Sequence, residues 1–558
     1  MHRTFETSTT RRQRSLDGQW AFAPDPDGEF DGPGDLPADP DTIPVPCAWN
    51  ALPEHYDYHG SAWYRRTFHL PERANLRCTF LGVAQDATVF LDGEQTTTHF
   101  GAYTPFSFLA PDLAAGEHEL VARVDNRRDE TTIPKPASDW FPYGGITREV
   151  LLEEVPSVFL DEFAIEYDLD GGDAHLTVDI DVGNLGDDAE TRLGVEIGGV
   201  RTGKTVEIPA GGTDERVEFD VPDVDRWSTN EPTLYDVSVT AGEDERRDRI
   251  GFREVAVEGR EILVNGEPVS IRGVNRHEDH PEWGHAQPLR IMDGDIDLIE
   301  EGGFNAIRGS HYPNHPRFLD RCDEAGILVI EEIPFWQFDG DEFRHGPVME
   351  RGKRMLVELI ERDRHHPSVF AWSVSNECAN EEEGVYEATA ELTSLAREAD
   401  GSRLVTLASN TDVSGGTDEC FELCDFICLN GYWGWYSEGS WAEFLDRVAG
   451  KYPNCPLIVS EFGGGAIVGE RPRDGQKWSE PYQADLLEET VATFLDTEFL
   501  AGFTVWQFCD TRTSPKRWQD RPRTKNNKGI VGEYRTPKEA YRRLERLLTD
   551  SGNGGEED

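Results

Sequence analysis

The second part of the chain constrains the fold most, because from about residue 262 short apolar runs alternate with helical patterns. The apolar runs are rich in β-branched residues, as in strands buried on both faces, and the helical patterns repeat apolar residues every three to four positions. Eight such strands over roughly 290 residues match the size of a (β/α)8 barrel. The predicted strands are residues 271–275, 305–308, 327–330, 369–374, 404–408, 426–429, 457–459 and 503–508.

The part that precedes the barrel is predicted to be all-β, in two blocks. Residues 1–156 carry short aromatic and β-branched runs closed by Gly, Asp or Pro, which indicates a jelly-roll sandwich. Residues 157–261 alternate apolar and polar positions, as in 174–182, over a length that fits an immunoglobulin-like sandwich. We therefore predict a multidomain β plus α/β protein, with the barrel at 262–549 and a disordered acidic tail at 550–558.

Polar side chains follow seven of the eight predicted barrel strands, at the end where barrels of this type place their active groups. The buried run 370–377 ends in Asn376 and Glu377, and the run 457–464 reaches Glu461 and then glycines. Two carboxyl groups at strand ends are the minimum needed for retaining cleavage of a glycosidic bond. Further candidates at these positions are Arg308, His311, Tyr432 and Trp506.

The residue types suggest a role for each candidate. Glu377 is the predicted acid/base and Glu461 the predicted nucleophile, which Arg308 and Tyr432 would keep ionised. Asn376 is suited to hydrogen-bond a sugar hydroxyl. The competing hypothesis is a divalent-metal hydrolase built from these carboxylates and histidines. We favour the mechanism with two glutamates and expect no metal in the site.

Several motifs in register resemble glycoside hydrolase family 2. They are residues 272–278, 305–313, 376–377 and 460–463. The likeness covers nearly the whole chain, including the order of jelly roll, immunoglobulin-like domain and barrel. It implies a glycosidase that needs no organic cofactor and self-associates as a homo-oligomer. The family includes β-galactosidases, β-mannosidases and β-glucuronidases.

Residues 525–529 bear on the choice of sugar. Asn526 and Lys528 form an Asn-x-Lys pair similar to the motif by which β-glucuronidases bind the sugar carboxylate, with amide and ammonium both donating to it. The resemblance implies a retaining exo-β-glucuronidase acting on a small glucuronide or an oligosaccharide. A β-galactosidase or β-galacturonidase of the same family remains the alternative, and a non-catalytic carbohydrate-binding protein is the remote one.

Other site residues are implied only by the resemblance. The loop 430–436 is similar to the β-glucuronidase loop after strand six, which points to Tyr432 and Tyr436. Asp139 resembles an aspartate that the first domain lends to the sugar site. A further arginine contact to the carboxylate falls on Arg521 or Arg523, between which the sequence does not decide.

The charge balance limits the partners. The chain has 108 acidic and 54 basic residues, a formal net charge of −54, and only nine of the basic residues are lysines. Such a field repels nucleic acid and anionic membranes, so we expect neither as a partner. The acidic residues are spread along the chain, a pattern that resembles cytoplasmic proteins of salt-loving organisms, where the Debye length falls to about 3 Å at 1 M salt.

Targeting signals and cysteines indicate the compartment. No apolar run of about 20 residues exists, and residues 1–14 lack the apolar segment of a secretory signal. Nine dispersed cysteines suit a reducing environment, so we expect a cytoplasmic protein. Cys420, Cys424 and Cys428 have a spacing that also occurs in metal or redox sites, but Cys428 lies in a predicted strand, which favours core packing.

Overall fold

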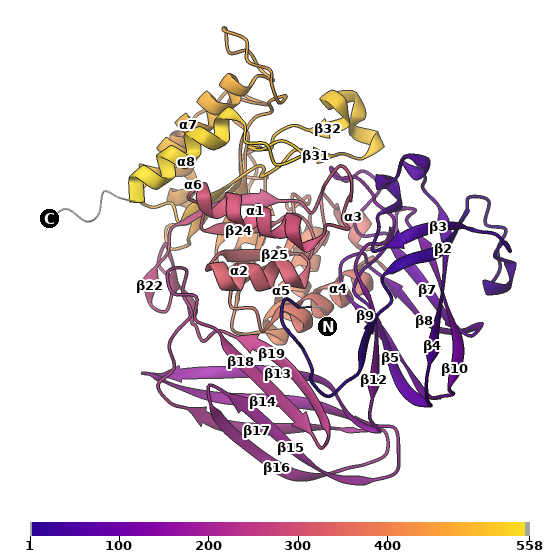
Figure 1. Cartoon of the computed structure of the whole chain (residues 1–558). Helices are drawn as coiled ribbons and strands as arrows, with labels where there is room; N and C mark the ends of the chain where they lie inside the picture. The colour runs from indigo at the N-terminus through magenta and orange to yellow at the C-terminus, as the bar shows by residue number, and fades with distance from the viewer. Residues whose placement is uncertain (1–2, 553–558) are drawn as a thin grey trace.

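The computed structural model describes residues 3–552, and it confirms the predicted fold class: two β-sandwiches and a closed barrel (Figure 1). The first sandwich, indigo in the figure, lies beside the barrel, and the second, purple, lies below it. We keep the predicted domain limits as a proposal. The limit at 156/157 falls between β12 and β13, and the limit at 261/262 falls at the start of β21.

The jelly roll consists of two main sheets, with strand orders β1-β12-β5-β9 and β3-β2-β4-β10-β7-β8. Its core is aromatic, with Trp20, Phe22 and Tyr64 fully buried, as the strand patterns predicted. The loop 126–144, between β10 and β11, leaves this domain toward the barrel. The strands are β1 (Gln13–Ser15), β2 (Gly18–Asp25), β3 (Asp41–Val45), β4 (Ser61–Leu70), β5 (Ala74–Phe80), β6 (Val83–Ala84), β7 (Asp86–Leu91), β8 (Glu94–Phe100), β9 (Phe106–Leu113), β10 (Gly116–Asp125), β11 (Gly145–Ile146) and β12 (Val150–Val155).

The immunoglobulin-like sandwich pairs the sheet β13-β14-β17 with the sheet β16-β15-β18-β19. In β14 every second side chain from Ala174 to Val182 is buried, as the alternating pattern predicted, because successive strand residues point to opposite faces. The strands are β13 (Val158–Asp170), β14 (Asp173–Asn184), β15 (Ala189–Ile197), β16 (Val200–Ile208), β17 (Thr213–Val221), β18 (Tyr235–Ala241) and β19 (Asp244–Ile250).

The barrel is closed by eight parallel strands in sequence order. All eight residues of β26 are buried, which explains its continuous apolar run. The strands are β23 (Ile271–Arg276), β24 (Ala306–Gly309), β25 (Leu328–Glu332), β26 (Val369–Asn376), β27 (Leu404–Ser409), β28 (Ile427–Asn430), β29 (Leu457–Glu461) and β30 (Gly502–Val505). The helices are α1 (Leu289–Glu301), α2 (Pro316–Ala325), α3 (Gly340–Phe343), α4 (Val348–Asp363), α5 (Glu383–Ala399), α6 (Trp441–Lys451), α7 (Glu480–Leu495) and α8 (Glu539–Gly552).

Two short sheets flank the barrel. The first sheet precedes the barrel and consists of β20 (Val255–Glu258), β21 (Glu261–Val264) and β22 (Glu267–Pro268). Its residues Ile262 and Val264 belong to the same buried cluster as Ile271 and Ile458 of the barrel. The second, β31 (Thr511–Arg512) and β32 (Lys525–Asn526), follows β30 and carries the predicted carboxylate motif. The loop between β31 and β32 contains Arg521 and Arg523.

The prediction that Trp506 lies within the eighth strand is wrong. Strand β30 ends at Val505, and the N–H of Trp506 donates to the carbonyl oxygen of Phe462 at 2.9 Å, outside the barrel ladder. Its indole ring is buried and packs against His277 and His311, with ring centroids 5.4 and 5.2 Å apart.

The N-terminal arm and helix α8 form the two ends of the described chain. The N-terminal arm lies between the immunoglobulin-like domain and the barrel, where the guanidinium of Arg3 pairs with Asp248 of β19 at 2.9 Å and Asp320 of α2 at 2.6 Å. Helix α8 extends to Gly552, and residues 553–558 of the predicted disordered tail lie outside the described residues. None of the helices described is long and apolar enough to cross a membrane.

Candidate active site

The two predicted catalytic carboxyl groups lie at the C-terminal end of the barrel. Glu461 is the last residue of β29 and is 4% exposed. Glu377 follows β26 directly, is half-buried, and has a left-handed backbone (φ 49°) with its N–H donating to the carbonyl of Ala408 at 2.8 Å. The more open environment of Glu377 suits exchange of protons with substrate and water.

Glu461 is held by one cation and one phenol. Arg308 Nη1 donates to Oε1 at 3.0 Å, and the Tyr432 hydroxyl donates to Oε2 at 2.6 Å. Burial raises the pKa of Tyr432 well above its usual range, so its proton stays available for this bond. The contacts expected to support an ionised Glu461 are thus present.

The net electrostatic effect on Glu461 is the opposite of the expected one. Burial, followed by the charge of Glu377, raises the pKa of Glu461 to about 8, although Arg308 and Tyr432 oppose the rise. The sequence could indicate the two partners but not how deeply the carboxyl group is buried. Glu461 therefore holds its proton more tightly in the free protein than an exposed glutamate does.

Arg308 connects the groups around Glu461. Its Nη2 donates to Glu332 Oε2 at 2.7 Å and to Asn376 Oδ1 at 2.8 Å. Its Nη1 also donates to Asn275 Oδ1 at 2.9 Å. The opposing carboxylates of Glu332 and Glu461 outweigh burial and raise the pKa of Arg308, so this buried guanidinium remains charged. A planar guanidinium bound on both edges is a rigid support for the carboxylate that it faces.

Asn376 has an amide group available for a ligand. Its Oδ1 also accepts from Asn430 Nδ2 at 3.1 Å, whereas its Nδ2 is buried and has no hydrogen-bond partner among the described residues. A buried donor without a partner is costly, so a bound hydroxyl would stabilise it. This agrees with the predicted role in holding a sugar hydroxyl.

Glu377 accepts one hydrogen bond at each carboxyl oxygen. Gln337 Nε2 donates to Oε2 at 2.9 Å, and Asn430 Nδ2 donates to Oε1 at 3.1 Å. Asn430 is the last residue of β28, whereas Gln337 lies in the loop after β25. Neither residue was among our candidates. The strand-end position could have indicated Asn430, but nothing in the sequence indicated Gln337.

Aromatic rings form one wall of the site. His311 stacks on Trp506 with ring centroids 5.2 Å apart and packs against Trp140 at 5.4 Å. Its Nδ1 lies 2.8 Å from Glu332 Oε1. Burial lowers the pKa of His311, so a neutral imidazole faces the carboxylates.

A second cluster contains the predicted carboxylate-binding residues. Lys528 is 3% exposed, and its Nζ donates to the Tyr436 hydroxyl at 2.8 Å. Arg521 Nη2 donates to both carboxylate oxygens of Asp139 at 3.0 Å, and Asn526 Nδ2 donates to one of them at 2.9 Å. The jelly roll and the β31–β32 hairpin therefore meet at this cluster.

The contacts distinguish the two candidate arginines. Arg521 Nη1 donates to the Tyr436 hydroxyl at 3.3 Å, so that one phenol oxygen accepts from both Arg521 and Lys528. Burial raises the pKa of Tyr436, but these two cations outweigh it and lower the pKa. Arg523, by contrast, has a side chain that is 57% exposed and pairs with Glu533. Arg521 is therefore the arginine that belongs to the cluster.

The two clusters form one continuous site. The rings of Tyr432 and Tyr436 have centroids 5.3 Å apart, and Lys528 Nζ lies 5.2 Å from the Tyr432 ring. Tyr432 in turn donates to Glu461. The structure thus brings together all eleven candidates: Asp139, Arg308, His311, Asn376, Glu377, Tyr432, Tyr436, Glu461, Trp506, Asn526 and Lys528.

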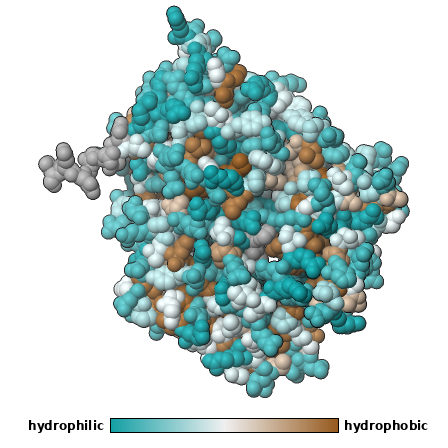
Figure 2. Space-filling view, viewed as in Figure 1, coloured by the Kyte–Doolittle hydropathy of each residue, from teal (hydrophilic) through white to brown (hydrophobic). Residues whose placement is uncertain are grey.

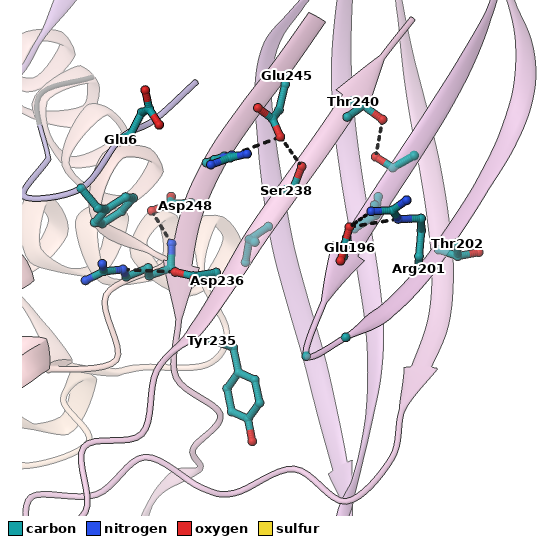
Figure 3. Close-up of a pocket in the computed structure, with 18 of the residues that line it drawn as sticks. Glu6, Glu196, Arg201, Thr202, Tyr235, Asp236, Ser238, Thr240, Glu245 and Asp248 are labelled. Carbon is teal, nitrogen blue, oxygen red and sulfur yellow. Dashed lines mark hydrogen bonds and ion pairs between the residues drawn. The ribbon is translucent and has the colours of Figure 1, made fainter. Parts of the chain in front are cut away.

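Other polar groups lie apart from this site. A cavity of about 890 Å³ on the immunoglobulin-like domain contains none of the candidates, and several of its charged side chains pair with one another, as Glu196 does with Arg201 (Figure 3). Within the described chain, Asp320, Asp323 and His366 could hold a metal ion, but the Asp320 oxygens already accept from the N-terminal arm.

The three closely spaced cysteines pack in the barrel. Cys420 and Cys428 are buried in its hydrophobic clusters, and Cys424 packs against one of them. Burial raises the pKa of all three thiols, which keeps them protonated. Core packing, which the sequence favoured, describes them well.

Three family models match consecutive parts of the chain. The model of the glycosyl hydrolases family 2 TIM barrel domain matches residues 255–550, that of glycosyl hydrolases family 2 matches 158–253, and that of the family 2 sugar binding domain matches 13–156. Together they cover nearly the whole sequence.

Individual relatives match over nearly their whole length. A β-glucuronidase of Streptococcus agalactiae is 27% identical, over 96% of this chain and 96% of its own. The crystal structure of a GH2 β-galacturonidase from Eisenbergiella tayi bound to galacturonate is 33% identical, with a TM-score of 0.91 and 99% of each chain covered. That of Ruminococcus gnavus β-glucuronidase is 27% identical, with a TM-score of 0.86, and covers 98% of this chain and 99% of its own.

Proposed function

Because the chain belongs to glycoside hydrolase family 2 and is a glycoside hydrolase, we propose that it is a retaining exo-β-glucuronidase. The observation that carries this proposal is the cationic cluster beside the two carboxyl groups. Lys528 carries three N–H donors, and Tyr436 is its hydrogen-bond acceptor among the described residues. Its remaining donors and those of Arg521 and Asn526 suit a carboxylate on the sugar.

The chemistry follows from the placement of the two glutamates. Glu461 attacks the anomeric carbon while Glu377 gives its proton to the glycosidic oxygen, and the bond to the leaving group breaks. Glu377 then removes a proton from water, which attacks the same carbon and releases Glu461. Arg308 and Tyr432 stabilise the carboxylate of Glu461 before attack and again as it leaves.

A β-galacturonidase is the second candidate. The E. tayi enzyme has a higher identity and TM-score than the R. gnavus β-glucuronidase. Glucuronate and galacturonate differ at one hydroxyl group, and both present the carboxylate that the cationic cluster suits. Hydrolysis of 4-nitrophenyl glucuronide, galacturonide and galactoside, measured in parallel, distinguishes the candidates. Turnover of the galactoside alone would exclude both uronides.

Replacing Lys528 with Ala is expected to lower kcat/KM on the preferred uronide by about 2 kcal/mol, the scale of a charge-assisted hydrogen bond. Neutral glycosides should be little affected, because they lack the carboxylate that Lys528 would bind. The measurement is kcat/KM on a uronide and on a neutral glycoside. Arg523→Ala is the matched control, since Arg523 is a nearby cation in the β31–β32 loop that is exposed and pairs with Glu533. Equal losses on charged and neutral substrates would contradict the carboxylate assignment.

Salt is expected to lower KM for an anionic substrate. A protein of formal net charge −54 repels a uronide at low ionic strength, and the surface is largely hydrophilic on the face in Figure 2. We expect KM to fall about threefold or more between low salt and 1 M salt. The titration should follow protein folding by circular dichroism and include a neutral glycoside. A KM for the uronide that stays flat or rises in folded protein would contradict the electrostatic argument.

A further inference from the structure

We propose that Gln337 is a positioning residue for the acid/base Glu377, and that Lys135 of the first domain holds Gln337 in place. The inference rests on the proposed acid/base role of Glu377. Its starting point is the contact between Gln337 Nε2 and Glu377 Oε2 at 2.9 Å. Gln337 is half-buried, and its side chain meets the carboxyl oxygen opposite the one that Asn430 contacts.

The backbone of Gln337 is tied to the strand that carries Glu377. Its N–H donates to the carbonyl oxygen of Asn376 at 2.8 Å, and the N–H of Asn376 donates to the carbonyl oxygen of Phe335 at 2.8 Å. Gln337 itself has a left-handed backbone (φ 56°), an unfavourable conformation for a residue other than glycine, asparagine or aspartate. Such a conformation persists only where its surroundings impose it, and strained conformations of this kind cluster at functional sites.

Lys135 supplies the constraint on the other side. It belongs to the loop 126–144 of the jelly roll, and its Nζ donates to the carbonyl oxygen of Gln337. The same ammonium pairs with Glu342 of α3 at 2.7 Å and lies 5.4 Å from the ring centroid of Phe338. The first domain thus contacts both ends of the site: Asp139 reaches the carboxylate cluster, and Lys135 reaches the loop beside the acid/base.

The contacts of Glu377 suit a carboxyl group that transfers a proton in each of the two reaction steps. Glu377 must deliver its proton to the glycosidic oxygen as the carbon–oxygen bond breaks, and must then accept a proton from the attacking water as the ester to Glu461 breaks. Both transfers need the carboxyl oxygens at a defined place. The amides of Gln337, in the loop after β25, and of Asn430, at the end of β28, hold one oxygen each, so that rotation of the carboxyl group is restricted.

The test compares Gln337→Leu and Lys135→Met with the wild type on aryl glycosides of the sugar that the wild type hydrolyses fastest. The aryl groups run from good to poor leaving groups. A poor leaving group requires the proton of Glu377, so we expect Gln337→Leu to lower kcat/KM about tenfold or more there, because the hydrogen bond that orients the carboxyl group is lost. For a good leaving group kcat/KM should change less than about twofold, because its departure needs no proton. In that case kcat and KM should fall together, because Glu377 must still act as the base when water attacks the glycosyl-enzyme.

Lys135→Met is expected to reproduce the same pattern at smaller amplitude. The matched control is Lys353→Met, which removes an ammonium group whose ion-pair partners among the described residues are Glu350 and Glu391. In a Glu377→Ala background, Gln337→Leu should have no further effect on the leaving-group slope. A uniform loss across all leaving groups, or a full additional loss in that background, would overturn the proposal. Absence of turnover of every glycoside by the wild type would instead contradict the proposed function.

Discussion

Replacing Glu461 with Gln is expected to abolish hydrolysis of every glycoside that the enzyme accepts. The amide has nearly the same shape but cannot attack the anomeric carbon, so kcat/KM should fall on the order of 10⁵-fold, the scale seen when a covalent nucleophile is removed. Folding should be retained, because the amide oxygen can still accept from Arg308 Nη1, and the amide nitrogen can donate to the oxygen of the Tyr432 hydroxyl. The measurement is initial rate on a 4-nitrophenyl uronide at high enzyme concentration.

Glu331→Gln is the matched control for this change. Glu331 is also a fully buried carboxyl group at a strand end, and burial raises its pKa to about 8, but it is bound by Asn314 and contacts neither catalytic glutamate. We expect the control to keep most of the activity. Substantial hydrolysis by folded Glu461→Gln would remove Glu461 as the nucleophile.

Replacing Glu377 with Ala should give losses that depend on the leaving group. For a poor leaving group kcat/KM should fall about 10³-fold, within the range that general acid catalysis contributes. A good leaving group departs without a proton, so its kcat/KM should fall less than about tenfold. Added azide needs no base to attack the glycosyl-enzyme and fits the space left by the side chain, so it should restore turnover and yield a glycosyl azide.

The same variant should change the pH profile. In the wild type, burial and the Glu377 charge raise the pKa of Glu461 to about 8, and Glu461 must be ionised to attack the anomeric carbon. For a good leaving group, which needs no proton, kcat/KM should therefore rise with pH up to about pH 8. In Glu377→Ala the repelling charge is gone, so the pKa of Glu461 should fall and this rise should move to lower pH. Exposed Glu381, in the same loop, supplies the control variant Glu381→Ala. A uniform loss without azide rescue would assign the acid/base role elsewhere.

The barrel and its catalytic end could be predicted because they depend on local pattern. Buried parallel strands need continuous apolar runs, as in β26, and the closing polar residues then fall at one end of the barrel. Asn376, Glu377 and Glu461 are recognisable for this reason. The assignment of Asn526 and Lys528 came from resemblance rather than pattern, since an Asn-x-Lys tripeptide has no intrinsic structure.

Contacts between distant loops could not be predicted. Arg521 and Arg523 are equivalent in sequence, and only the path of the β31–β32 loop turns Arg521 toward Asp139, which lies 382 positions earlier. Gln337 lies in a loop with no periodicity, and its meeting with Glu377 depends on a lysine from another domain.

The sequence by itself determined the eight-stranded barrel, the two sandwiches before it and the strand-end carboxyl groups, because periodic burial and strand termination depend on residues that are close together in the sequence. The tertiary structure alone decided which arginine joins the sugar site, which amide holds Glu377, and that the pKa of Glu461 rises rather than falls. These properties depend on burial and on distances between segments, and electrostatic energies change steeply with both.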